Sequence, residues 1–243
     1  MPEPLAITRF LNLIFGGMVA SLLHLVGITA DPATAINDTF AMELLVVVGL
    51  IAFFAIVRLT LSVEKPNAAQ QIAELINGFT GEQAEQVMGH GFERFQAFVT
   101  CVLLFVLLNN VAGLIPGVVT PTSQAVVPLG IASLTFLYYN FHGIRVQGVI
   151  GYLKHFAGPV WWLAPLLFPV EIISHLARVM SLTIRLYANM LASDLLTLIC
   201  FSLFPLVAPS AFLGLHFAVS LIQAYVFMLL SIIYLSMAVS HDH

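Results

Sequence analysis

The sequence contains very little charge. Asp, Glu, Lys and Arg make up only 8% of the 243 residues, whereas hydrophobic residues make up 60%; an average soluble domain is about 25% charged. A chain of this length cannot hide so much apolar surface in one core, because a small domain leaves much of its surface exposed. The mean hydropathy is +1.01. The composition therefore excludes an ordinary water-soluble protein and predicts an integral membrane protein.

Cysteine and positive charge are also scarce. Two cysteines, Cys101 and Cys200, exclude a disulfide framework, and we expect both to be buried, small apolar side chains. The 8 Lys and Arg are outnumbered by 12 Asp and Glu, which excludes a basic nucleic-acid-binding face. The motifs HExxH, GxSxG and CxxC and a Gly-rich phosphate loop are missing from the sequence. We therefore expect no cofactor, no metal site and no enzymatic centre of these types.

Long apolar runs dominate the sequence, and their lengths predict membrane helices. A helix needs about 20 mostly apolar residues to cross the hydrocarbon layer. One such run covers residues 42–61, and residues 95–144 have room for two more, joined by a turn-rich stretch at 116–128. Residues 161–239 are typical of a long helical hairpin. The sequence therefore predicts an all-α protein with five membrane helices.

Two further helices are expected at the membrane surfaces. Residues 8–28 are apolar but interrupted by glycine and polar residues, which favours an interfacial or re-entrant helix. This helix and an outer loop make up an amino-terminal segment, residues 1–41, and residues 42–243 form the membrane domain. Residues 68–88 alternate apolar and acidic side chains at helical spacing, which predicts an amphipathic helix on the inner surface, broken at Gly78 and Gly81.

The positive residues predict the orientation of the helices, since Lys and Arg collect in cytoplasmic loops. Arg58, Lys65 and Arg94 flank the loop between the first two spans, and Arg145 and Lys154 follow the third span. The uncharged loop at 118–127 is then outside. Five spans place the N-terminus outside and the C-terminus in the cytoplasm.

The hairpin is longer than a membrane is thick. Residues 170–204 would extend about 52 Å as one helix, against about 30 Å of hydrocarbon, and residues 210–239 would extend about 45 Å. Upright arms of this length would leave the bilayer, so we expect both arms to be strongly tilted. A slanted hairpin is suited to lie across an assembly partner.

Polar residues are concentrated in this hairpin, although ionisable groups at membrane depth are costly and usually functional. Helical spacing places Arg178, Ser181, Arg185 and Asn189 on one face of the first arm, with Asp194 on the opposite face. On the second arm, His216, Ser220 and Gln223 share a face. In an antiparallel hairpin, two residues at the same depth on opposite arms have residue numbers that add up to the same total at every depth. We therefore expect Asp194 to lie near the depth of His216, and Arg185 near that of Gln223.

Several of these residues have a structural alternative. Arg178 lies near the inner end of its arm, where its side chain can reach the headgroups as an anchor. Asp194 and His216 can form a buried pair that only packs the helices. Glu171 and His175, four residues apart near the inner end, can line a wet channel mouth or an interfacial face. Arg185 has no acidic residue within eight positions, so a functional role is favoured.

Two other classes of protein are compatible with this pattern. The first is a membrane scaffold or receptor in which the polar stripe only packs helices. The second is an intramembrane hydrolase, for which Ser193 and His216 are the one available pair, although no glycine-flanked serine elbow accompanies them.

Seven sequence motifs resemble a known family. They are SLTIRLYANM at 181–190, ASD at 192–194, LIQAYVFM at 221–228, YLSMA at 234–238, IAELINGF at 72–79, LNNVAGLIP at 108–116 and GYLKHF at 151–156. Together they resemble subunit a of the membrane (Fo) sector of F-type ATP synthases, from about residue 42 to the C-terminus. Gln124 and Val126 depart from the family, in which many members have an acidic residue and an asparagine.

The resemblance implies a proton-translocating stator subunit in a bacterial plasma membrane. Arg185 matches the essential arginine that faces a ring of c subunits, while Gln223 and Asn189 match its polar neighbours. Asp194 and His216 match a pair that lines the half-channel open to the outside, and Glu171 and His175 are expected on the proton path. The implied partners are the c ring, the b subunits of the peripheral stalk, the rest of the synthase and membrane lipid. The chain would be no enzyme by itself, because partner subunits make or hydrolyse ATP.

Overall fold

The computed structural model describes residues 5–25, 31–32, 34–115, 120–157, 164–203 and 208–239. All regular secondary structure in these ranges is helical, as predicted. The elements are α1 (Ala6–Leu25), α2 (Asp38–Leu59), α3 (Ala68–Met88), α4 (Glu93–Ala112), the 3-10 turn η1 (Pro121–Ser123), α5 (Val126–Ala157), α6 (Ala164–Leu203) and α7 (Ala208–Val239).

Four helical segments in the described chain are long and apolar enough to cross a membrane. They are Asp38–Leu59, Glu93–Ala112, Pro165–Cys200 and Ala211–Val239. These segments correspond to the first, second, fourth and fifth predicted spans. The third predicted span is helical as α5 but less apolar, because Tyr138, Asn140 and His142 interrupt it. Membrane helices are therefore confirmed, whereas the total of five stays a prediction.

The beginning of α2 is fixed by side-chain hydrogen bonds. Asn37 caps the helix by accepting a hydrogen bond from the backbone N–H of Phe40 at 2.8 Å. Asp38 accepts a hydrogen bond from the Thr8 hydroxyl of α1 at 2.5 Å. Asn12 of α1 also exchanges two hydrogen bonds with the backbone of Ile36. The expected amino-terminal helix thus exists as α1 and is attached to the start of α2, while residues 26–28 of that prediction lie outside the described residues.

The predicted break in the amphipathic helix was wrong. α3 is continuous through Gly78 and Gly81. A Cβ atom at Gly81 would lie 2.8 Å from Nε2 of Gln96 on α4, so this glycine allows two helices to approach closely. The hydroxyls of Thr80 and Thr100 hydrogen-bond across the same interface at 2.8 Å. Gly81 therefore serves helix packing, whereas a Cβ atom at Gly78 would meet no neighbour within 4 Å, and neither glycine ends the helix.

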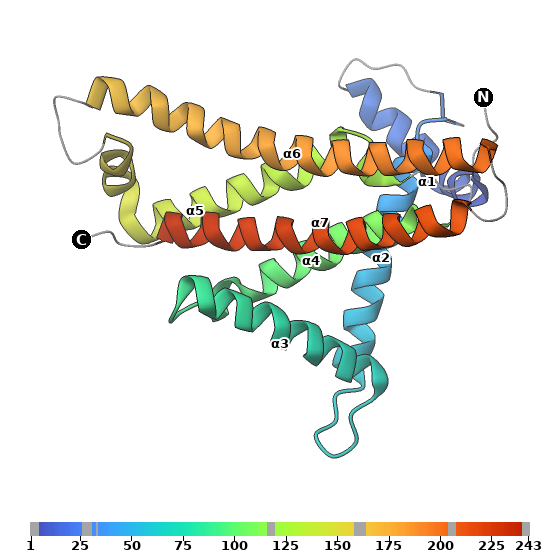
Figure 1. The fold of residues 1–243 in the computed structure, drawn as a ribbon, viewed down its shortest axis with the longest axis horizontal. Coiled ribbons are helices and arrows are strands. Elements are labelled where there is room, and N and C mark those ends of the chain that lie inside the picture. The colour runs from blue at the N-terminus through green and yellow to red at the C-terminus, as the bar shows by residue number, and fades with distance from the viewer. Residues whose placement is uncertain are drawn as a thin grey trace.

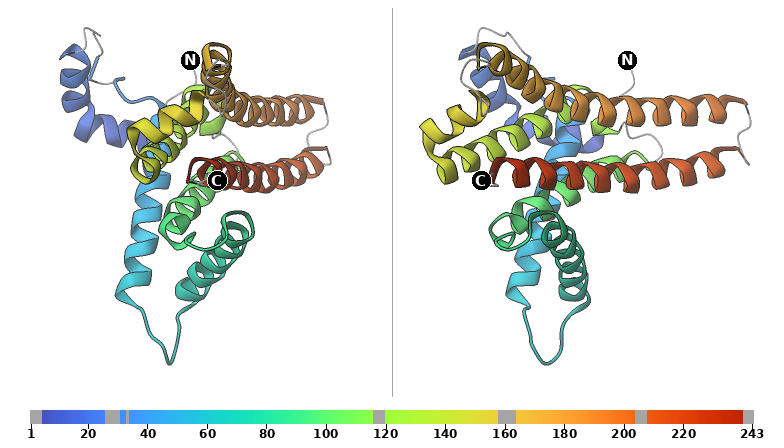
Figure 2. Two further views of the ribbon diagram at one scale, coloured as in Figure 1. Left: turned by 90° about the vertical axis from the view of Figure 1, so that its left-hand side faces the viewer. Right: turned by 60° about the vertical axis from the view of Figure 1, so that its left-hand side comes forward.

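The two hairpin arms, α6 and α7, run side by side, and both lie across the direction of α2 (Figures 1 and 2). α4 and α5 pack against them and complete the main core. The largest fully buried side chains of this core include Tyr139, Leu186, Met190, Phe227, Met228 and Ile232. α5 bends at Gly148, whose φ of 73° lies in the left-handed region that favours glycine.

The cysteines do not lie where we expected. Both are free thiols, but Cys101 is exposed and Cys200 is partly exposed. The prediction of burial was wrong because a transmembrane helix also presents apolar residues to lipid, on faces that the protein itself does not cover.

Candidate functional site

Arg185 lies on an outward face of the hairpin. Its side chain is exposed, and its Nη2 donates a hydrogen bond to Oγ of Ser181, one turn earlier on α6, at 3.4 Å. Asn189, one turn later, is also exposed, and its Nδ2 donates to Oε1 of Gln223 on α7 at 3.0 Å. Gln223 itself is buried. The predicted stripe on α6 is thus confirmed as one face, and the structure joins it to α7 through Asn189 and Gln223.

Asp194 and His216 lie at similar depth, as the hairpin register predicted, and they are also in contact. Oδ1 of Asp194 lies 3.7 Å from Nδ1 of His216, whose side chain is almost completely buried. The hydroxyl of Ser193 lies 2.8 Å from the same Nδ1 atom. Nε2 of His216 lies 3.3 Å from the backbone carbonyl oxygen of Asn110 on α4. These contacts place Asp194 toward the other helices of the chain, away from the Arg185 face.

The segment between α4 and α5 completes this cluster. The hydroxyl of Thr120 donates to Oδ1 of Asp194 at 2.7 Å, and the hydroxyl of Thr122 donates to Oδ1 of Asn110 at 2.6 Å. Thr120, Thr122 and Asn110 are buried. A Cβ atom at Gly113 would overlap the Thr120 side chain, so only glycine lets this segment approach α4. We call Asp194, His216, Ser193, Thr120 and Asn110 the outer cluster.

Thr120, Thr122 and the role of Asn110 were not predicted from the sequence. The only available signal was a polar Thr-Pro-Thr run inside an apolar, uncharged stretch that also contains Asn110. Gln124, which stands where many family members have an acidic residue, is exposed at the end of η1. Threonine hydroxyls of η1 and the residue before it therefore supply the polar groups at this end of the hairpin.

The hydrogen bonds of the outer cluster define the tautomer of the neutral His216 ring. A backbone carbonyl oxygen can only accept a hydrogen bond, so the neutral ring carries its proton on Nε2 and leaves Nδ1 as the acceptor. Nδ1 of this tautomer accepts the hydrogen bond that the Ser193 hydroxyl donates.

The same geometry argues against a hydrolase. In a serine hydrolase triad, the serine and the acid contact opposite nitrogens of the histidine ring. Ser193 and Asp194 both approach Nδ1 of His216, while Nε2 faces a backbone carbonyl. His216 therefore cannot take the Ser193 proton while being oriented by Asp194 from the other side.

A second polar cluster lies toward the beginning of α6. Glu171 lies 3.4 Å from Nε2 of His175 and 3.9 Å from Nη2 of Arg178. The hydroxyl of Tyr139 on α5 lies 2.8 Å from Nδ1 of the buried His175. The Arg178 guanidinium lies 5.4 Å from the ring centroid of Tyr234 on α7, a cation–π distance. We call these five residues the inner cluster.

Arg178 contacts an acid and an aromatic ring of the same chain. Its role as a membrane anchor or as a functional residue stays a prediction. Tyr139 and Tyr234 were not predicted as site residues, because both lie in apolar helices other than α6 and carry no charge.

Comparisons with known proteins identify the family of this chain. A profile of the ATP synthase A chain family matches residues 39–236. ATP synthase subunit a of Koribacter versatilis (strain Ellin345) is 48% identical over 244 residues, covering 100% of both chains. ATP synthase subunit a of Solibacter usitatus (strain Ellin6076) is 46% identical over 202 residues, covering 83% of this chain and 87% of the relative. Because the match covers most of its length and includes both hairpin arms, the chain belongs to the ATP synthase A chain family.

Proposed function

We propose that the chain is the proton-translocating stator subunit of an F-type ATP synthase in a bacterial plasma membrane. It provides two offset aqueous half-channels, while ATP is made or hydrolysed by partner subunits. The c ring faces Arg185, and the b subunits of the peripheral stalk hold the chain in place. The observation that carries this proposal is an exposed arginine between two separate proton-capable clusters on one hairpin.

The spacing along α6 supports two half-channels rather than one continuous pore. His175 of the inner cluster lies ten residues before Arg185, or about 15 Å along the helix. Asp194 of the outer cluster lies nine residues after Arg185, or about 13 Å. A guanidinium stays charged in proteins, so Arg185 repels a proton that would pass directly between the clusters. The proton must then travel on a carboxylate of the rotating partner.

Buried polar atoms near the outer cluster favour a hydrated path. Oδ1 of Asn109 and Oγ of Ser220 are buried and have no hydrogen-bond partner among the described residues. Buried polar atoms of this kind are usually satisfied by ordered water. Ser220 lies one turn beyond His216, and its carbonyl oxygen accepts a hydrogen bond from Asn110 at 3.5 Å. Water there would connect His216 to the outside.

The shape of the hairpin supports contact with a ring. α6 has 40 residues and would extend about 60 Å, twice the hydrocarbon thickness. Both arms run across α2 (Figure 1). We propose that the arms incline more than about 40° from the membrane normal, beyond the usual range of tilt, with the N-terminus outside and the C-terminus cytoplasmic. The Arg185 guanidinium would face the ring and lie within about 10 Å of Gln223. Two long side chains can interact over this distance through a bridging water. A structure of the assembled complex with upright arms would contradict this arrangement.

Replacement of Arg185 tests the function itself. Arg185→Ala should abolish ATP-driven proton pumping in membrane vesicles while the complex still assembles. Arg185→Lys should not restore pumping fully, because an ammonium is a point charge with a shiftable pKa and not a permanently charged planar fork. The control is Arg145→Ala, which removes an exposed arginine of α5. Normal pumping by either Arg185 variant would support the scaffold alternative and refute the stator.

A further inference from the structure

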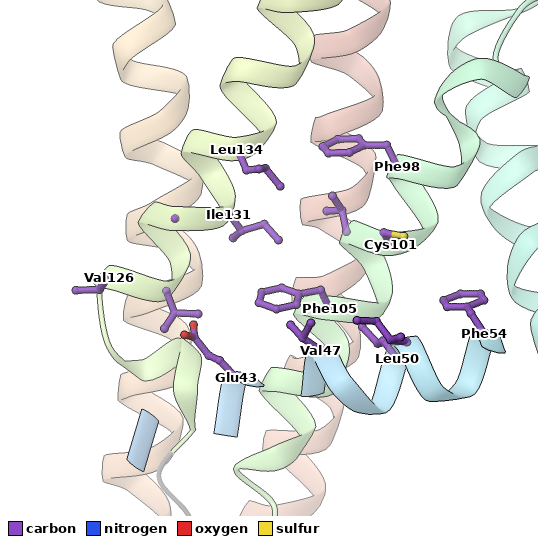
Figure 3. A pocket seen from close by; sticks show the side chains of 14 residues that line it. Glu43, Val47, Leu50, Phe54, Phe98, Cys101, Phe105, Val126, Ile131 and Leu134 are labelled. Atoms are coloured by element: carbon purple, nitrogen blue, oxygen red, sulfur yellow. The ribbon is translucent and has the colours of Figure 1, made fainter. Parts of the chain in front are cut away.

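A cavity of about 760 Å³ opens between α2, α4 and α5, away from the hairpin (Figure 3). Its volume is within the range of about 300–1,000 Å³ that is typical of small-ligand sites. Fourteen residues line it, and Glu43 is the only charged one. The site is separate from both polar clusters of the hairpin, so it requires an explanation of its own.

Glu43 lies at one end of this cavity, with its side chain directed toward the first turn of α5 (Figure 3). The side chain is half-buried, and no described residue forms a hydrogen bond or an ion pair with its carboxylate. An unpaired carboxylate in apolar surroundings at membrane depth is costly. An occupant with a positively charged hydrogen-bond donor at this end would remove that cost.

The length of the cavity along α2 matches one leaflet of a bilayer. The lining extends from Glu43 to Phe54 along α2, about 16 Å, while the wall formed by α5 crosses this direction (Figure 3). Half of the hydrocarbon thickness is about 15 Å. Glu43 lies in the second turn of α2, near the end of that span. A headgroup at Glu43 would therefore place a hydrocarbon chain along the cavity.

The side chains of the walls favour a flexible chain over a partner helix. Helix–helix interfaces in membranes are enriched in small residues that let the backbones approach. This cavity is instead walled by bulky side chains, among them Leu50, Phe54, Phe98, Phe105 and Ile131. Gly130 and Cys101 are the only small residues that line it. An acyl chain can adapt to such irregular walls, whereas a rigid helix would leave voids.

We propose that this cavity binds one acyl chain of an amine-bearing phospholipid of the phosphatidylethanolamine class, with the headgroup ammonium paired to the Glu43 carboxylate. The ammonium supplies both the positive charge and the N–H donors that the carboxylate lacks. A phosphatidylcholine headgroup has the charge without the N–H, and a phosphatidylglycerol headgroup has neither. The site should therefore distinguish these three lipids.

The test is photo-crosslinking of the whole purified complex in phosphatidylcholine vesicles. Each preparation contains a trace of one probe, a phosphatidylethanolamine, a phosphatidylcholine or a phosphatidylglycerol, with the same diazirine midway along one acyl chain. Crosslinked peptides are identified by mass spectrometry. In the unchanged protein, the phosphatidylethanolamine probe should label cavity-lining peptides of α2, α4 and α5 several-fold more than the other two.

Two variants and a matched control connect the labelling to the cavity. Glu43→Gln should lower labelling by the phosphatidylethanolamine probe to the level of phosphatidylcholine. Gly130→Phe should remove it for all three probes, because a side chain at Gly130 meets no protein atom and extends into the cavity. Gly49→Phe, at an exposed glycine of α2 that does not line the cavity, should leave labelling unchanged. Assembly and proton pumping should be retained in all three variants.

Equal labelling by the three lipids in the unchanged protein would overturn the proposal, as would full retention of the preference in Glu43→Gln. Crosslinks from the cavity to another subunit, without lipid labelling, would show that a partner helix occupies it and would also overturn the proposal. Neither result would affect the stator function, which is tested separately at Arg185.

Discussion

Thr120 provides the sharpest test of the outer cluster, because a single hydroxyl connects the segment before η1 to the hairpin. This side chain is completely buried and donates a 2.7 Å hydrogen bond to Oδ1 of Asp194. Thr120→Val removes the hydroxyl and keeps the shape of the side chain. Among the described residues, Oδ1 of Asp194 then keeps only the Nδ1 atom of His216 nearby, at 3.7 Å, which is beyond hydrogen-bond distance.

The size of the expected effect follows from the chemistry of this hydrogen bond. A hydrogen bond to a charged group contributes about 1.5–3 kcal/mol. If Thr120 holds Asp194 in the position needed for proton exchange with His216, the loss of this energy slows conduction by about tenfold to a hundredfold, since 1.4 kcal/mol is one factor of ten. Thr120→Ser keeps the hydroxyl and should retain most of the rate.

The assay is passive proton conduction through the membrane sector, measured in vesicles stripped of the ATP-hydrolysing subunits after a potential is applied. The matched control is Thr135→Val, which also changes a fully buried threonine, but one that bonds only the Ile131 carbonyl oxygen of its own helix. Conduction should be unchanged in this control. In an Asp194→Asn background, Thr120→Val should cause little further loss, because the charged acceptor is already gone.

Three results would refute this reasoning. One is normal conduction in Thr120→Val. Another is equal loss in Thr120→Val and Thr120→Ser. The third is full additivity with Asp194→Asn, which would mean that Thr120 acts on folding and not through the carboxylate.

Three further predictions concern the same machinery. Gly113→Ala should reduce conduction at least about tenfold by displacing Thr120, whereas Gly214→Ala, where a Cβ meets nothing, should not; equal rates in the two variants would contradict the close approach. Tyr139→Phe should slow conduction a few-fold, because the buried His175 loses a 2.8 Å partner worth about 1 kcal/mol, whereas Tyr138→Phe, which keeps the ring stacked on Phe98, should not. Single cysteines at Asp194 and His216 should react with a water-soluble thiol reagent added from the outside, and Asp194→Asn should slow conduction; inaccessible sites with unchanged flux would indicate a purely structural pair.

Much of the hairpin could be predicted because its pattern is local. Helical periodicity alone separates Arg185 from Asp194 on α6. The structure shows Arg185 exposed, and Asp194 in contact with His216 of α7 and with Thr120, the residue before η1. Antiparallel pairing of two long arms also predicted that Asp194 and His216 lie at similar depth, and in the structure they are 3.7 Å apart. For Gln223 the partner in the structure is Asn189, one turn from Arg185, because depth along a helix is known only to within a turn.

Local patterns failed where a residue's role depends on its neighbours in space. Gly78 and Gly81 have the propensity of helix breakers, yet the close approach of α4 explains Gly81 inside a continuous helix. Cys101 lies in an apolar run typical of a core, yet its side chain is exposed beside the open cavity between α2, α4 and α5. Neither outcome can be derived from periodicity, since both depend on which face of a helix another helix covers.

The sequence by itself determined the membrane environment, the positions of the helices and the polar faces of both arms, because these follow from composition, run length and a period of 3.6 residues. Only the tertiary structure decided which groups complete the proton-capable clusters. Thr120 meets Asp194 across 74 positions of sequence, and Asn110 meets His216 across 106. Such pairs form because buried polar atoms in a membrane must find partners within the protein, and which partners lie within reach depends on how all the helices pack together.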